Sequence, residues 1–183
     1  MSRLRHAPGA VAAAYTTPAR LDMSGRVLTF AMEIFTVYHG ILFLHLLAAT
    51  VWTGGHLVLV ATVLPRALRA RNPRILLDFE QGYEKIGMPA LLIQVATGLW
   101  MAHQQAPVLA HWLAPTNPVE SLIRMKLGLL AITVLTALDA RLRIIPNLTA
   151  QTLPAMARRI AVVSTVSVAF VVVGVSFRSG WLV

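Results

Sequence analysis

The stretch that decides the fold is IFTVYHGILFLHLLAATVWTGGHLVLVATVLP, residues 34–65, which contains no Asp, Glu, Lys or Arg. As a helix rising 1.5 Å per residue it is roughly 48 Å long, more than the ~30 Å hydrocarbon core of a bilayer requires. Three of the six histidines of the chain lie in it, at His39, His45 and His56. Because polar side chains at membrane depth usually face a bundle interior and serve function, this helix is where a functional site is expected.

The composition of the whole chain also indicates a membrane protein. Of its 183 residues, 57% are hydrophobic and 13% are charged, whereas about a quarter are charged in a soluble domain. The sequence has no cysteine, which excludes disulfides, thiolate metal sites and cysteine nucleophiles. The net charge of +9 is divided among the tail and short connections without an aromatic-studded basic face, so we expect the lipid bilayer and no nucleic acid as a partner.

Largely apolar segments predict four membrane-spanning helices, at about 34–65, 84–103, 120–143 and 158–179. The predicted fold class is therefore all-α, an integral-membrane four-helix bundle formed by residues 33–183. We interpret residues 1–32 as a poorly ordered N-terminal tail that can end in a short interfacial helix from Val27 to Phe35. A targeting role for this tail is the alternative.

The third span contains two charged residues, Lys126 and Asp139. Only about a dozen uncharged residues separate them, or roughly 18 Å of helix. That length does not cross the hydrocarbon core, so at least one of the two side chains lies within the membrane or snorkels to its edge.

Basic residues predict the orientation of the bundle. They are concentrated in a loop over residues 65–85 and in the connection over residues 140–159, whereas the connection between the second and third spans has only Arg124. By the positive-inside rule, both basic connections are cytoplasmic, and both termini and residues 104–122 lie on the periplasmic side. We therefore expect a multi-pass protein of the bacterial inner (cytoplasmic) membrane.

With this topology, imidazoles and cations from all four helices converge in the outer half of the membrane. The candidate metal ligands are His39, His45, His56, His103 and His111. The candidate cations beside a cofactor are Arg124, Lys126 and Arg178. Neutral imidazole binds haem iron and copper well, and the cations can pair with haem propionates.

The spacing of the histidines limits how they can act together. His45 and His56 share a face of the first helix with Trp52, but they are about 16 Å apart along its axis, too far to bind one ion. His39 is rotated by about 120° from His45. A ligand set must therefore be completed from another helix, for which His103 and His111 are the candidates.

A packing role is the alternative for each of these histidines. A buried histidine in a membrane bundle can bond to a backbone carbonyl or a hydroxyl instead of a metal. His56, beside Gly54 and Gly55, can fill a close contact between helices in which the glycines matter most.

Three segments carry a resemblance to known families. They are LHLLAATVWTGGHLVLVATVLPRAL (44–68), FEQGYEKIGMPALLIQVATGLWMA (79–102) and IRMKLGLLAITVLTALDARL (123–142). They resemble helices shared by copper-resistance protein D (CopD-type) domains and by the HemJ-type protoporphyrinogen oxidase, a haem-binding four-helix protein. The firmest matches are His45, Trp52, Gly55, Pro65, Arg66, Gly98 and Lys126. A longer interval between Trp52 and Pro65 and the additional histidines favour the CopD side.

The resemblance implies that His45 is an axial haem ligand, with Lys126 and Trp52 beside the cofactor. The favoured function is binding of haem b, copper or both in the periplasmic half, for electron transfer with a quinone or periplasmic partner or for copper handling. A homodimer is compatible with this function. The alternatives are a HemJ-like haem-dependent protoporphyrinogen oxidase, copper transport past successive histidines, and a cofactor-free structural subunit of a membrane complex.

Overall fold

The computed structural model describes residues 23–182, and all structural statements concern these residues. Most of the predicted N-terminal tail, residues 1–22, lies outside them. The chain divides into two compact units, Met1–Tyr38 and His39–Val183. In the first unit, the described part is the beginning of helix α1 (Met23–Val58), where the Thr36 hydroxyl donates to the Met32 carbonyl at 2.8 Å. The segment predicted as a short interfacial helix belongs to this continuous helix.

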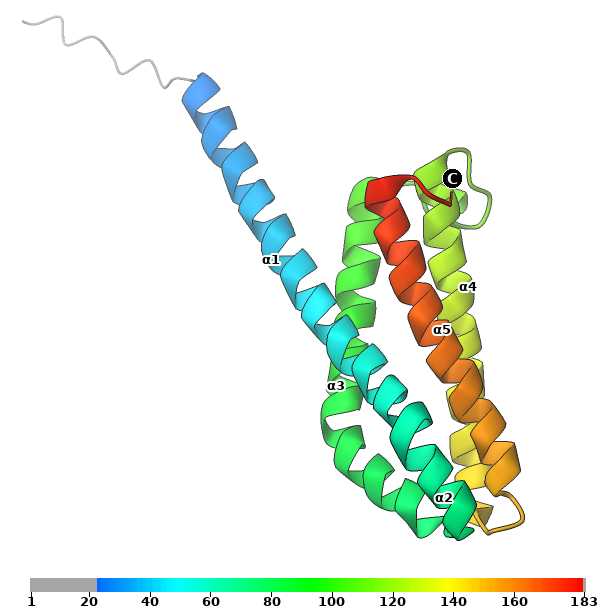
Figure 1. Cartoon of the computed structure of the whole chain (residues 1–183). Coiled ribbons are helices and arrows are strands. Elements are labelled where there is room, and N and C mark those ends of the chain that lie inside the picture. Colours follow the sequence, from blue (N-terminus) through cyan, green and yellow to red (C-terminus); the bar gives the residue numbers. More distant parts are fainter. Residues whose placement is uncertain (1–22, 183) are drawn as a thin grey trace, which may run out of the picture. The chain divides into compact units, whose positions relative to one another are not determined.

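The second unit holds the rest of α1 and all the other described helices (Figure 1). These are α2 (Leu64–Ala70), α3 (Arg74–Gln105), α4 (Pro118–Asp139) and α5 (Leu153–Ser179). Four helical segments are long and apolar enough to cross a membrane: Phe35–Ala70, Arg74–Gln105, Pro118–Asn147 and Leu153–Ser179. Residues 23–182 contain no strand, so the prediction of an all-α protein with four membrane-spanning helices is confirmed.

The prediction of a loop over residues 65–85 is wrong, because the chain there is almost entirely helical. Pro65 lies in the first turn of α2 and follows a π-helical turn at Leu59–Val63. Proline has no N–H for a bond to the preceding turn, and the local change of helix type lets the chain continue past it. The helix ends at Arg71, whose φ of 49° is left-handed, and α3 begins at Arg74.

Sequence signals at the ends of α4 and α5 agree with the structure. The Asn117 side chain caps α4 by accepting a hydrogen bond from the Glu120 N–H at 3.0 Å, and Pro118 occupies the first turn. Helix α5 ends before Gly180, whose φ is 64°.

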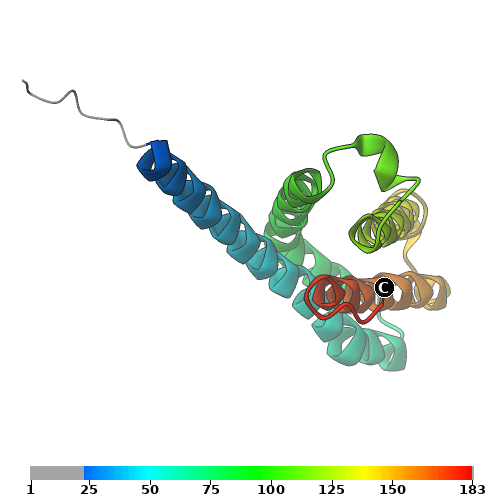
Figure 2. The same cartoon turned by 90° about the horizontal axis from the view of Figure 1, so that it is seen from above.

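Helices α4 and α5 pack along one another (Figures 1 and 2). A buried apolar cluster joins α2 to α3 and α5 at one end of the unit, and its members are Leu64, Ala67, Leu76, Leu153 and Ile160. Many large apolar side chains elsewhere are exposed, among them Phe43, Leu92 and Leu135. In a bilayer these side chains contact lipid, as the exterior of a membrane bundle does.

Asp139, the charged residue at the end of α4, is neutralised by a pair with α5. Asp139 Oδ2 accepts from both Nε and Nη2 of Arg159 at 2.6 Å. Arg143, one turn further along, has its Nη1 3.5 Å from Asp139 Oδ1. The apolar stretch of α4 can therefore be short, because the carboxylate at its end is paired.

Candidate functional site

His45 on α1 is joined to Thr97 on α3 by a hydrogen bond of 2.9 Å between Nδ1 and Oγ1. Thr97 Oγ1 also lies 2.6 Å from the Ile93 carbonyl oxygen, one turn back in α3. A threonine hydroxyl has one proton, and the short contact to the carbonyl uses it, so we infer that Oγ1 accepts from Nδ1–H. The neutral ring then keeps an unshared electron pair on Nε2, the form of imidazole that binds a metal.

Gly98 allows the His45 ring to lie close to the backbone of α3. A Cβ at Gly98 would be 3.1 Å from Cε1 of the ring and 3.7 Å from Nδ1. The shorter distance is tighter than ordinary carbon–carbon packing, so a larger residue would push the ring away. Thr97 and Gly98 together therefore fix both the orientation and the position of His45.

Lys126 on α4 extends toward α5. Its Nζ lies 4.9 Å from the centre of the Phe177 ring, a cation–π contact. A Cβ at Gly174 would be 3.7 Å from the same Nζ, so this glycine leaves room for the ammonium group. The charge of Lys126 acts on the His45 ring, which puts both side chains in one electrostatic neighbourhood.

These contacts form two groups, one between α1 and α3 around His45 and one between α4 and α5 around Lys126. Because the charge of Lys126 acts on the His45 ring, we name the two groups together the His45 site. Its members are His45, Thr97, Gly98, Lys126, Gly174 and Phe177. The arrangement combines an oriented imidazole with a nearby cation, which suits a metal cofactor with anionic groups.

His56 belongs to a separate group, the His56 cluster, formed by Trp52, His56, Phe79 and Tyr83. Its ring is buried, and Nδ1 lies 2.9 Å from the Trp52 carbonyl oxygen, which can only accept, so Nδ1 carries a proton. The ring centroid is 4.3 Å from that of Trp52 and 6.0 Å from that of Tyr83, which meets it edge-on. Phe79 stacks on Tyr83 with centroids 5.6 Å apart.

Tyr83 links the His56 cluster to the backbone of α1. Its hydroxyl lies 3.1 Å from the carbonyl oxygens of both Val51 and Trp52. A Cβ at Gly55 would overlap the tyrosine ring, and one at Gly87 would come within 2.6 Å of it. The two glycines thus leave the space into which the Tyr83 ring fits between α1 and α3.

His111 lies in the connection between α3 and α4. Its Nδ1 is 2.9 Å from Oε1 of Glu120, a buried carboxylate. The other oxygen, Oε2, accepts from the N–H of Thr116 at 2.7 Å and from its hydroxyl at 2.9 Å. These bonds tie the connection to the first turn of α4.

Four other predicted site residues lie at exposed positions, namely His39, His103, Arg124 and Arg178. In the part of the chain that the structure describes, no three His, Asp or Glu side chains are grouped closely enough to hold a metal ion. Of the other predicted residues, Lys126 acts on His45 through its charge, while Trp52 lies in the His56 cluster.

Comparison with known families adds an independent observation. The family described as copper resistance protein D, CopD, matches residues 77–178, more than half of the chain. The chain belongs to the CopD family. Neither the curated proteins nor the solved structures provide a match.

The CopD match covers all of α4 and nearly all of α3 and α5. It includes Thr97, Gly98 and Lys126, whereas His45 lies outside it on α1. The predicted CopD resemblance is confirmed, and the HemJ resemblance stays a prediction.

Several residues of the His45 site in this CopD-family protein are not predicted as site residues from the sequence. Thr97 is one of many threonines in apolar spans, and only its position beside Gly98 distinguishes it. Gly174 and Phe177 are three residues apart and so share a face of α5. That signal becomes useful only once Lys126 is known to face them.

Proposed function

We propose that this CopD-family protein binds a metal cofactor through His45, with haem b favoured, and acts in electron transfer or copper handling in the bacterial inner membrane. The observation that supports the proposal most is the His45–Thr97 hydrogen bond. With the proton on Nδ1, Nε2 is the nitrogen that would bind a metal, and a hydrogen bond at the other ring nitrogen raises the basicity of such a ligand.

The residues fit a haem iron better than a copper ion held by protein ligands alone. A porphyrin supplies four nitrogens, so one or two axial side chains complete the coordination. A copper ion without a porphyrin takes several protein ligands, and no group of three His, Asp or Glu side chains includes His45 among the described residues. When bound, a haem supplies a one-electron redox couple.

The remaining side chains of the His45 site have roles that follow from their contacts. Thr97 sets the tautomer of His45, and Gly98 leaves space for its ring beside α3. Lys126 places a positive charge near the imidazole, and Phe177 and Gly174 keep its ammonium group in the bundle. Such a cation favours the binding of an anionic group, for example a haem propionate.

Copper handling is the second candidate, because copper resistance is named in the description of the matching family. It would use the same Nε2 of His45 with ligands from outside the described groups. A haem-dependent oxidation of protoporphyrinogen would also use an axial His45, so it shares the first test.

The test is an absorption spectrum of the detergent-purified protein, oxidised and dithionite-reduced, from cells with ample haem. We expect a Soret band and sharp reduced bands in the wild type, and their loss in His45→Ala. His111→Gln is the matched control, because His111 lies in the connection between α3 and α4 and takes no part in the contacts of the His45 site. Its loss should leave the spectrum unchanged.

Elemental analysis of the same samples separates the outcomes. Copper without a Soret band, lost in His45→Ala, supports the second candidate and excludes haem. A wild type without haem or copper contradicts the proposal and supports a structural subunit.

A further inference from the structure

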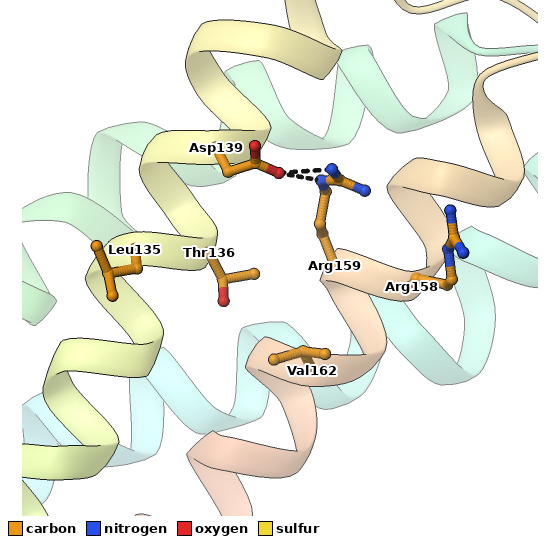
Figure 3. A pocket seen from close by; sticks show the side chains of 6 residues that line it. All are labelled: Leu135, Thr136, Asp139, Arg158, Arg159 and Val162. Carbon is orange, nitrogen blue, oxygen red and sulfur yellow. Dashed lines mark hydrogen bonds and ion pairs between the residues drawn. The ribbon is translucent and has the colours of Figure 1, made fainter.

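A pocket of about 360 Å³ lies between α4 and α5, at the end of the bundle where α4 finishes and α5 starts (Figure 3). It is lined by Leu135, Thr136, Asp139, Arg158, Arg159 and Val162. Asp139 is more than three turns from Lys126 along α4, roughly 20 Å. The pocket is therefore distinct from the His45 site.

The pocket changes from charged to apolar along the helix axes. Asp139 and Arg158 lie at its outer end, near the connection between the two helices. Leu135 and Val162 lie one turn deeper on their helices, about 5.4 Å further into the bundle, and they are 67% and 42% exposed. In a bilayer, these exposed apolar side chains would contact acyl chains, and the charged end of the pocket would lie among the headgroups.

Cations exceed carboxylates at the outer end of the pocket. Arg159 is held by Asp139, as the dashed lines in Figure 3 show. Arg143 shares the same carboxylate from the rim. Arg158 is exposed and has no dashed line, and none of the described residues accepts a hydrogen bond from it. At the outer end, the Arg158 guanidinium therefore has no acceptor among the described residues, and the arginines there outnumber the one carboxylate.

We propose that this pocket binds an anionic phospholipid, with its phosphate at Arg158 and the first part of its acyl chains along Leu135 and Val162. Guanidinium groups bind phosphate oxygens through two parallel hydrogen bonds. Basic pockets between membrane helices favour anionic headgroups. A free phosphate would leave the apolar half of the pocket unused, whereas a lipid fills both halves. The proposal does not depend on the cofactor at His45.

The test is lipid binding by the full-length protein in detergent, measured by native mass spectrometry. Phosphatidylglycerol is compared with phosphatidylcholine of the same acyl chains, and inorganic phosphate is added as a competitor. We expect preferential binding of phosphatidylglycerol that Arg158→Gln weakens about five-fold and Arg158→Lys largely keeps. Arg69→Gln is the matched control, because Arg69 is an exposed arginine on α2 outside the pocket.

A second variant tests the pocket without changing its charge. Val162→Trp fills the apolar half and should abolish the preference for phosphatidylglycerol. Equal binding of the two lipids by the wild type, or equal effects of Arg158→Gln and Arg69→Gln, would overturn the proposal. So would displacement of the lipid by inorganic phosphate at matched concentration, which indicates a free-anion site, or an unchanged preference in Val162→Trp.

Discussion

Single glycines decide where rings fit between α1 and α3. Gly98 accommodates the His45 ring, and Gly55 and Gly87 accommodate the Tyr83 ring. Helices in lipid gain little from hydrophobic burial, so close contact through small residues supplies much of their packing. The imidazole that we propose as a ligand is therefore positioned by the same close packing through glycine that brings the helices together.

Gly55→Ala should destabilise the protein, because the added Cβ would overlap the Tyr83 ring. Overpacking of this kind costs typically about 1–3 kcal/mol. Gly54→Ala is the matched control, since nothing lies within 4 Å of its added Cβ. Thermal unfolding in detergent should show a lower midpoint for Gly55→Ala alone. If both variants unfold at the wild-type temperature, Tyr83 does not pack on Gly55.

Thr97→Val should weaken cofactor binding, because the variant cannot accept the Nδ1–H bond that orients the His45 ring. Loss of such a partner typically lowers metal affinity about 10–100-fold. The measurement is haem or copper occupancy of the purified protein. Thr97→Ser should keep the bond and the occupancy. Thr50→Val is the control, since that exposed hydroxyl bonds only the Leu47 carbonyl, at 2.7 Å. Full occupancy in Thr97→Val would exclude a positioning role for Thr97.

Among the secondary-structure elements, the spans are predictable from the sequence but their ends are not. Long apolar segments identify four membrane-spanning helices, because length and composition alone decide whether a helix can cross a bilayer. Pro65 is misleading as a stop signal, since the π-helical turn before it lets the helix continue to Ala70. Residues 74–85 belong to the segment 65–85 that the sequence predicts as a basic loop, yet they form the first turns of α3, and Leu76 packs there in the apolar cluster with α2 and α5.

The His45 site is predictable in part for a related reason. His45 and Lys126 are conspicuous because polar residues are rare in apolar segments. Their partners Thr97, Gly174 and Phe177 depend on how each helix is rotated about its axis. Composition does not specify that rotation in a membrane, because the lipid-facing side is as apolar as the buried side.

In the bundle as a whole, the two candidate sites lie at different positions along the helix axes. The His45 site uses Lys126 near the start of α4, whereas the lipid pocket uses Asp139 at its end. The basic connections adjoin the pocket, so the positive-inside rule would place the pocket at the cytoplasmic surface and the His45 site in the periplasmic half. A cofactor at His45 would then be within reach of periplasmic partners, and anionic lipid would be available to the pocket.

This orientation is directly testable because the chain has no cysteine of its own. Val108→Cys places one thiol in the connection between α3 and α4, and Ala150→Cys places one between α4 and α5, both at exposed positions. We expect a membrane-impermeant maleimide to label Val108→Cys in spheroplasts and Ala150→Cys only after the membrane is opened. The cysteine-free parent controls for background. The opposite pattern would reverse the bundle, put His45 in the cytoplasmic half and exclude a periplasmic electron partner for it.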